Sequence, residues 1–195
     1  AALAGNANDL DSAQNDFRKV LDIDPKETRA YLGLARIFGQ QGQLDQAEKM
    51  LKQAAAIAPS SVQIRMALYN LYYGQQKFDS AEGVIKDLVE QNPDNADLLS
   101  TLGNFYFTRR NNKAAADAFQ RAVDTDPQNP KFYLILASFH EATGEPDKAL
   151  QAYKKALEVD PANISVMHSV ARFYLKQGND DDAQSVVTDI LAKRP

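Results

Sequence analysis

Six of the eight prolines in this 195-residue chain follow one another at a constant interval of 34 residues. They are Pro25, Pro59, Pro93, Pro127, Pro161 and Pro195. Because the residue before a proline is pushed out of the helical backbone conformation, each of these positions marks the end of a helix. The chain is therefore predicted to consist of one helical unit that repeats every 34 residues.

Frames drawn at this interval, with each repeating proline at frame position 32, align without a gap. They cover residues 28–61, 62–95, 96–129, 130–163 and 164–195, after a partial frame over 1–27. Frame position 20 is always alanine, as expected where two helices approach so closely that only a methyl group fits: Ala13, Ala47, Ala81, Ala115, Ala149 and Ala183. Positions 7 and 11 are predicted core positions: Leu34, Leu68, Leu102, Leu136 and Val170, then Phe38, Tyr72, Tyr106, His140 and Tyr174.

Apolar residues recur at helical spacing twice in each frame, with a polar or glycine-containing break between the two stretches. Each frame is therefore predicted to be a helix–turn–helix unit in an all-α fold. The expected helices are 10–23, 28–40, 44–57, 62–74, 78–91, 96–109, 112–125, 130–142, 146–159, 164–177 and 180–192.

Residues that favour helix starts support these boundaries. The residue that ends each frame is expected to cap the following first helix: Glu27, Ser61, Asn95, Asn129 and Asn163. Second helices are expected to open at residues such as Asp45 and Asp79. Glu48 and Glu82 stand three residues further on, which is the spacing of a capping-box partner.

At these positions the sequence resembles the tetratricopeptide repeat family, whose pattern is W-x2-L-G-x2-Y…A-x3-F…P. The frame over 96–129 carries the fullest match: Leu99, Leu102, Gly103, Tyr106, Ala115, Phe119, Ala122 and Pro127. Arg65, at the tryptophan position, departs furthest from the pattern. The resemblance implies a right-handed α-α superhelix, a single solenoid domain over 1–195 with five repeats and a partial N-terminal repeat. It also implies protein–protein recognition without catalysis.

The composition argues against several other functions. The longest apolar run, Phe132 to Ala137, is far shorter than the roughly 20 residues that a membrane-spanning helix needs. The absence of cysteine removes disulfides, thiolate nucleophiles and cysteine-based metal sites. A net charge of −4 disfavours a protein that neutralises many phosphates. We expect no cofactor, no metal, no nucleic-acid partner and no membrane insertion.

Candidate catalytic residues are few and poorly placed. His140 is expected to be a packed core imidazole, and His168 has no serine or carboxylate placed to form a triad with it. The acidic run Asp180 to Asp182 begins the last expected helix, where carboxylates complement the helix dipole and lack the spacing of a calcium loop. Neither a phosphate-binding loop nor an H-E-x-x-H zinc motif occurs. The chain is therefore predicted not to be an enzyme.

The resemblance further implies that frame positions 2, 5, 9, 12 and 13 of each first helix face the concave side of the solenoid. Position 9 holds Asn70 and Asn104 in successive frames, and Arg36 and Arg172 in the first and last full frames. Two asparagines on adjacent helices are suited to pair with the amides of an extended peptide backbone. An equally open alternative is that they bond to neighbouring helices or to water.

Positions 5 and 12 supply the apolar part of the predicted groove. Leu32, Met66, Tyr73 and Phe107 have the composition of a pocket for an anchoring side chain. The alternative is that Met66, Tyr73 and Phe107 mainly pack against the adjacent helix. The lysine and asparagine pattern with which some family members clamp a chaperone's C-terminal carboxylate is absent, because position 5 never holds lysine.

Three functional hypotheses remain. The first is an interaction scaffold that binds a partner polypeptide in the concave groove. The second is a self-associating structural element of a bacterial envelope, polysaccharide-export or secretion assembly. The third is the targeting arm of an enzyme whose catalytic domain lies outside this chain. The sequence carries no targeting signal, so bacterial cytoplasm and periplasm are both open.

The ends of the chain suggest a fragment of a longer array. Residue 1 falls at frame position 8, and no polar capping helix follows Pro195. In the last helix, Ala183, Val187 and Ile190 are expected to pack inward, whereas Val186 and Leu191 lie partly off that stripe. We therefore expect exposed apolar surface at the C-terminal end, end-to-end self-association, and higher mobility over residues 1–8 than over the central repeats.

Overall fold

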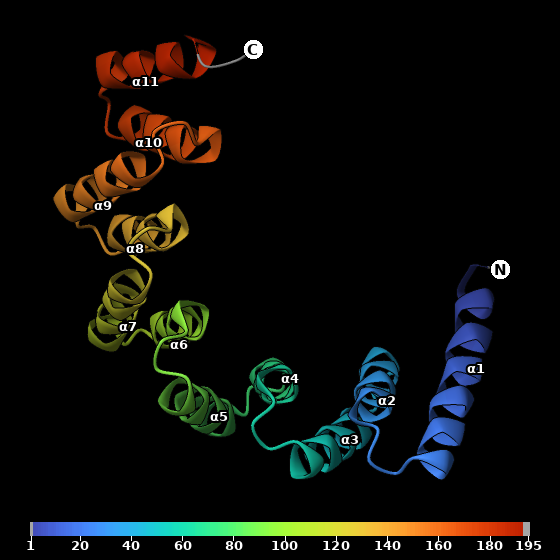
Figure 1. Ribbon diagram of the computed structural model, residues 1–195. Helices are drawn as coiled ribbons and strands as arrows, with labels where there is room; N and C mark the ends of the chain where they lie inside the picture. The colour runs from blue at the N-terminus through green and yellow to red at the C-terminus, as the bar shows by residue number, and fades with distance from the viewer. Residues whose placement is uncertain (1, 193–195) are drawn as a thin grey trace. The chain divides into compact units, whose positions relative to one another are not determined.

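The computed structural model describes residues 2–192, except for the side chains of residues 2–8 and 189–191. All secondary structure in this described part is helical (Figure 1). The helices are α1 (Ala2–Ile23), α2 (Thr28–Gln40), α3 (Leu44–Ile57), α4 (Val62–Gly74), α5 (Phe78–Gln91), α6 (Ala96–Thr108), α7 (Asn112–Thr125), α8 (Pro130–Ala142), α9 (Pro146–Val159), α10 (Ile164–Lys176) and α11 (Asp180–Ala192). The predicted all-α fold and its helix–turn–helix units are confirmed.

Helices α2 to α11 begin and end within one residue of their predicted bounds, and α1 is the exception. It was expected to begin near residue 10, but it begins at Ala2 and runs without a break through the place where the hairpin turn was expected. Alanine is the strongest helix former, and the alanine-rich start of the chain favours continuing the helix over forming a turn. Higher mobility was also predicted for residues 1–8. Residue 1 and the side chains of residues 2–8 lie outside the described part of the structure, so this remains a prediction.

The predicted N-caps of the first helices are confirmed. In each of them the side chain accepts a hydrogen bond from a backbone N–H in the first turn: Glu27, Ser61, Asn95, Asn129 and Asn163. These bonds satisfy donors that have no partner within the helix. Pro130 and Pro146 occupy the first turns of α8 and α9, where the missing N–H costs nothing.

One residue in each hairpin turn takes the left-handed backbone conformation, and these residues recur at the repeat interval. They are Gly42, Gln76, Arg110, Gly144 and Gly178, with φ values of 73°, 59°, 60°, 76° and 75°. Glycine adopts this conformation without steric conflict, whereas glutamine and arginine do so at an energetic cost. The turn between the two helices therefore has one geometry in all five hairpins, whatever residue occupies it.

The chain divides into two compact units, Ala1–Leu88 and Val89–Pro195, with the boundary inside α5. We call them the N-terminal unit and the C-terminal unit and describe each by itself. In the N-terminal unit, Leu34, Phe38 and Ala47 form a buried cluster against which Phe17 and Leu71 pack. This cluster joins α1, α2, α3 and α4 into one core.

In the C-terminal unit, consecutive helices from α6 to α11 pack against one another in chain order (Figure 1). The first helices α6, α8 and α10 also contact each other directly, α6 with α8 and α8 with α10. The frame alanines Ala115 and Ala149 are fully buried, and Ala183 is 2% exposed. The close helix approach that the repeated alanine predicted is therefore present.

The register of α11 differs from the predicted one. Val187, which was expected to pack inward, is 36% exposed, whereas Val186 is half-buried. The inward stripe therefore runs from Ala183 to Val186, at a spacing of three residues instead of four, and both spacings place residues on one helix face. The predictions for Ile190 and Leu191 concern side chains outside the described ones. No helix in the described part is long and apolar enough to cross a membrane.

Candidate functional site

In the N-terminal unit, the first helices α2 and α4 border an open cavity of about 910 Å³. Three of the residues predicted to contact a partner line it: Leu32 and Arg36 from α2 and Asn70 from α4. Arg36 and Asn70 are exposed, and Leu32 is half-buried. The fold therefore brings these three predicted residues together around one space.

The walls of this cavity are built from apolar and small residues. Phe17 from α1 and Leu71 from α4 contribute apolar surface, and Gly33 from α2 belongs to the same lining. A Cβ atom added to Gly33 would come within 2.4 Å of the Phe17 ring, so α1 can pack this closely only because Gly33 has no side chain. The amides of Gln40 and Gln63 also line the cavity, so hydrogen-bonding groups surround an apolar interior.

Met66 and Tyr73 do not belong to the described lining of this cavity, although both were predicted to face the groove. Both side chains are half-buried. The Tyr73 ring lies 5.8 Å from that of Tyr69 and meets Phe78 of α5 edge-on at 5.7 Å, measured between ring centroids. Tyr73 therefore packs against the adjacent helix, which was the alternative to a role in the groove.

In the C-terminal unit, a second cavity of about 500 Å³ lies between α6 and α8. Asn104 and Phe107 line it, as does Ser138 from α8. The Phe107 ring meets that of Phe139 edge-on at 5.4 Å, so it forms part of an apolar wall completed by Leu134. Asn104 and Ser138 are exposed. Asn104 and Asn70 belong to different compact units, so each asparagine is described only with the cavity of its own unit.

Arg172, the last of the predicted groove residues, lies on α10 beside a polar cluster that the sequence did not reveal. Glu141 of α8 accepts hydrogen bonds from Lys176 Nζ at 2.7 Å and from the Tyr153 hydroxyl at 3.0 Å. Lys176 holds the pKa of Glu141 below its usual value, and Arg172 acts in the same direction. Burial raises the pKa of the Tyr153 hydroxyl. The Glu141 carboxylate is therefore ionised and is surrounded by the Lys176 ammonium, the Tyr153 hydroxyl and the Arg172 guanidinium.

The N-terminal unit holds a similar carboxylate cluster at Glu48, which lies on α3. Glu48 accepts hydrogen bonds from Tyr72 at 3.2 Å and Lys77 at 3.0 Å, and it forms an ion pair with Lys52 at 2.7 Å. Together the two lysines lower the pKa of Glu48 to about 2. The capping-box role predicted for Glu48 is therefore wrong, because α3 is capped at Gln43 and the Glu48 carboxylate binds Lys52 one turn further along α3 and two residues of the next hairpin.

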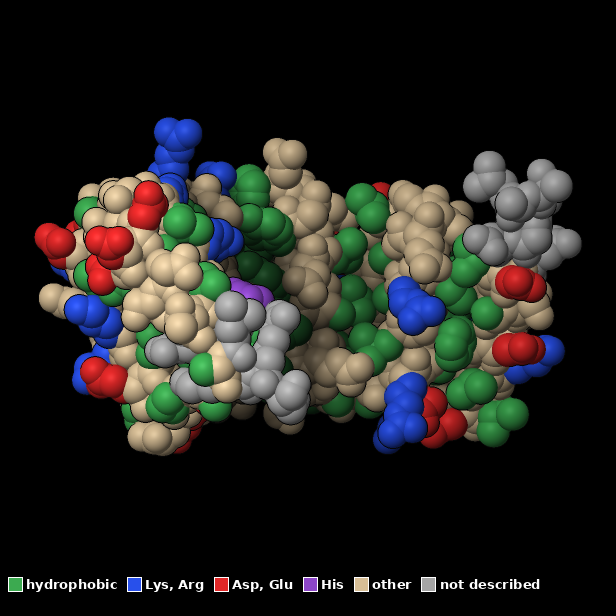
Figure 2. Space-filling model, turned by 90° about the horizontal axis from the view of Figure 1, so that it is seen from above, with side chains coloured by type: hydrophobic (Ala, Val, Ile, Leu, Met, Phe, Trp, Pro, Cys, Tyr) green, Lys and Arg blue, Asp and Glu red, His purple; other side chains and the backbone are tan. Residues whose placement is uncertain are grey.

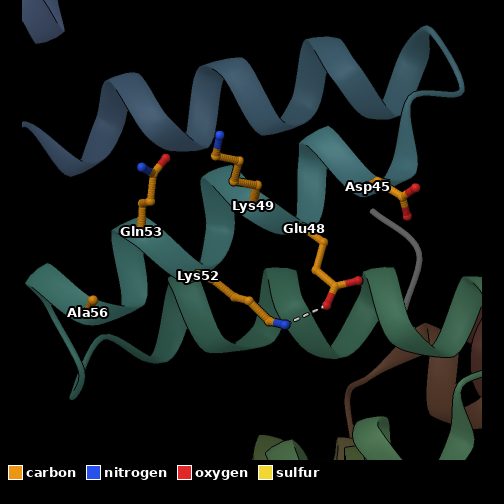
Figure 3. Close-up of a pocket in the computed structure, with 6 residues that line it drawn as sticks. All are labelled: Asp45, Glu48, Lys49, Lys52, Gln53 and Ala56. Atoms are coloured by element: carbon orange, nitrogen blue, oxygen red, sulfur yellow. Dashed lines mark ion pairs between the residues drawn. The ribbon is translucent and has the colours of Figure 1, made fainter.

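Figure 3 shows the ion pair between Glu48 and Lys52, with Lys49 and Gln53 extending from the opposite side of α3. The recess drawn there is lined by residues of α3: Asp45, Glu48, Lys49, Lys52, Gln53 and Ala56. The charged groups of this recess therefore come from one helix, and two of them are paired with each other.

The structure places the two histidines and the acidic run as follows. The imidazole of His140 is half-buried and lies 2.7 Å from a Glu145 carboxylate oxygen. Lys148 and then His140 lower the pKa of Glu145 to about 2. His168 is exposed. Asp180 to Asp182 form the first turn of α11. Within the described residues, no group of three or more potential metal ligands is found.

Acidic and basic side chains are interspersed on the face of the molecule that Figure 2 shows. Hydrophobic side chains are visible on the same face between the charged ones. This mixture agrees with the small net charge of −4.

Helix hairpins of one geometry, repeated along the chain, with cavities between their first helices, define an α-helical repeat protein. Sequence models of the tetratricopeptide repeat match residues 6–68, 40–105 and 142–195, and a second model of the same repeat matches 106–164. The chain belongs to the tetratricopeptide repeat family. Repeats of this family form protein-interaction scaffolds, and this is the general class of the chain. No curated protein sequence matches the chain.

Solved structures of other tetratricopeptide repeat proteins share the fold. MamA is 26% identical, with a TM-score of 0.62 over 85% of this chain and 91% of that one. BtubC from P. vanneervenii is 17% identical, with a TM-score of 0.70 over 100% of this chain and 91% of that one. YrrB is 18% identical, with a TM-score of 0.57 over 92% of each chain. The last two similarities concern the fold alone.

Proposed function

We propose that the chain binds a polypeptide partner on the exposed face of its first helices, and that the cavity between α2 and α4 receives a partner side chain. The observation that carries this proposal is that Leu32, Arg36 and Asn70, which come from two repeats, line one open cavity of about 910 Å³. That volume is within the range typical of ligand-binding clefts, about 300–1,000 Å³.

The chemistry of the cavity fits a peptide. Its apolar interior can bury a partner side chain, while the Asn70 amide offers a donor and an acceptor that match the N–H and C=O of an extended backbone. The Arg36 guanidinium adds donors for carbonyl or carboxylate oxygens. Arg36 is the one ionisable side chain in the described lining, so the cavity lacks the nucleophile, acid and base that catalysis would need. The solved structure of YrrB is described as having an unusual peptide-binding site, which supports the use of this fold for peptides.

The experiment is selection of peptide ligands for the full chain from a displayed library of random dodecapeptides, followed by affinity measurements on variants. Arg36→Ala and Asn70→Ala should each weaken the selected peptides by about 5- to 100-fold, because each removes hydrogen bonds across the interface. The control is Arg18→Ala, which removes an exposed arginine of α1 outside the described lining of the cavity.

Two results would contradict the proposal. One is that selected peptides bind Arg36→Ala and Asn70→Ala as tightly as the unaltered chain. The other is that no peptide is selected while light scattering shows the chain associating with itself, which would favour the structural-assembly hypothesis.

A further inference from the structure

The C-terminal unit presents two cations around a single carboxylate on its first helices. Glu141 of α8 accepts a hydrogen bond from Lys176 Nζ of α10 at 2.7 Å. Arg172 stands one turn before Lys176 on the same helix, and residues four apart share a helix face. One acidic group therefore faces two basic groups, and the cluster keeps a positive charge.

The two cations are more accessible than the carboxylate that they face. The Glu141 side chain is only 14% exposed, whereas that of Lys176 is 63% exposed, and Arg172 is exposed as well. The Tyr153 hydroxyl holds Glu141 from the inner side at 3.0 Å. A second carboxylate could therefore reach Lys176 and Arg172 from solvent without entering the core.

Both helices that carry this cluster also carry apolar surface. Ser138, one turn before Glu141 on α8, lines the cavity of about 500 Å³ that also contains Phe107. Leu175, next to Lys176 in the sequence, is 57% exposed. A ligand that combines an apolar residue with an acidic one would match both features at once.

We propose that Arg172 and Lys176 form a subsite for an acidic side chain of the polypeptide partner, and that Glu141 occupies this subsite as an internal competitor until the partner displaces it. This inference rests on the proposed function, because it assumes that the first-helix face binds a polypeptide. Lys176 can turn from Glu141 to the partner's carboxylate because its side chain is largely exposed, and Glu141 then keeps the hydrogen bond that it accepts from the Tyr153 hydroxyl.

The test uses two synthetic probes and charge-removing variants of the full chain. The first probe is an acetylated and amidated octapeptide of alternating leucine and glutamate, and the second has glutamine in place of glutamate. Binding is followed by NMR chemical-shift changes, which detect weak complexes, at low and at high salt. Glu141→Gln is compared with Glu158→Gln, which removes a carboxylate that pairs with Lys155 on α9. Lys176→Gln and Arg172→Gln are compared with Lys148→Gln, which removes an exposed lysine of α9 that pairs with Glu145.

The unaltered chain should bind the acidic probe more tightly than the neutral one, and salt should reduce the difference. Glu141→Gln should strengthen binding of the acidic probe by about 3- to 10-fold, and Lys176→Gln and Arg172→Gln should weaken it by a similar factor. The neutral probe should respond to none of these changes, and the two control substitutions should leave both probes unaffected. A merely structural Glu141 would give the opposite sign, because a loosened fold would weaken both probes.

Binding of the acidic probe that is unchanged or weakened in Glu141→Gln would overturn the inference. So would equal affinity for the two probes in the unaltered chain. If library peptides bind and are lost in Arg36→Ala while the acidic preference is absent, only the acidic subsite is refuted. If no peptide of any kind binds, the proposed function falls and this inference falls with it.

Discussion

Leucine in place of Ala115 should destabilise the C-terminal unit, and its cost follows from the space around the side chain. Ala115 is fully buried on α7, at the frame position where the two helices of a hairpin approach most closely. Three added carbon atoms would gain about 2 kcal/mol from burial if room existed for them. Because Ala115 is fully buried and closely packed interiors leave little free space, we expect the neighbouring helices to shift, and overpacking of this kind costs about 1–3 kcal/mol.

Ala13 provides a matched control at the same frame position. It lies on α1, is half-buried, and lines the open cavity of about 910 Å³. A leucine there can extend into free space and pack against Phe17 and Leu71, which line the same cavity. Ala13→Leu should therefore leave the stability of the N-terminal unit unchanged or raise it by up to about 1 kcal/mol.

The assay is urea unfolding followed by circular dichroism on the unaltered chain and on each variant. Repeat proteins can unfold in more than one step, so both the midpoint and the slope of each transition must be compared. An Ala115→Leu variant within about 0.5 kcal/mol of the unaltered chain would refute the reasoning. Equal losses at Ala115 and Ala13 would refute it as well, because the reasoning assigns the loss at Ala115 to a lack of space that Ala13 does not share.

Asn104→Ala should weaken a peptide bound at the α6–α8 cavity by about 1–3 kcal/mol in a titration while leaving the melting temperature nearly unchanged, and an equal loss of stability would reveal a structural asparagine. The folded state lowers the pKa of Glu48 to about 2, so its stabilising effect is complete above about pH 4.5 and is lost as the pH falls toward 2. Thermal melts should accordingly show Glu48→Gln less stable than the unaltered chain at pH 6 and the two converging near pH 2. Gly83→Ala should raise stability by about 0.5–1 kcal/mol, because nothing lies within 4 Å of the added Cβ, whereas Gly103→Ala should lower it by about 1–3 kcal/mol, because that Cβ would meet the Phe119 ring at 2.6 Å. Opposite signs in the two glycine variants, measured by chemical denaturation, are the expected outcome.

The fold could be predicted closely because its determinants are local and occur in every repeat. Asn95 illustrates this, since one side chain accepting a hydrogen bond from Leu98 N–H fixes where α6 begins. The buried alanines predicted the close approach of paired helices from their residue type alone. The register of α11 was harder to predict, because both Val186 and Val187 suit an inward face, and only packing decides between them.

The site was less predictable, because it depends on contacts between repeats. The pairs of Glu48 with Lys77 and of Glu141 with Lys176 join residues 29 and 35 positions apart. Helix periodicity does not indicate such pairs, since it describes one helix at a time. For the second pair a signal did exist: Glu141 is an acidic residue at frame position 12, and Lys176 is a lysine at position 13 of the next frame. Tyr73 shows the converse, because an aromatic residue at a groove position can equally well pack inside the hairpin.

The left-handed turn residues have a consequence for how the repeats come apart. Glycine holds this conformation in three hairpins, but Gln76 and Arg110 hold it in the α4–α5 and α6–α7 hairpins. A side chain in that conformation costs about 1–2 kcal/mol, so these two turns store strain that the other three lack. Repeats inside an array are normally the best protected from opening, because neighbours cover both sides. Here the strain falls on internal hairpins, which lowers the barrier to local opening at the repeats where protection would otherwise be greatest.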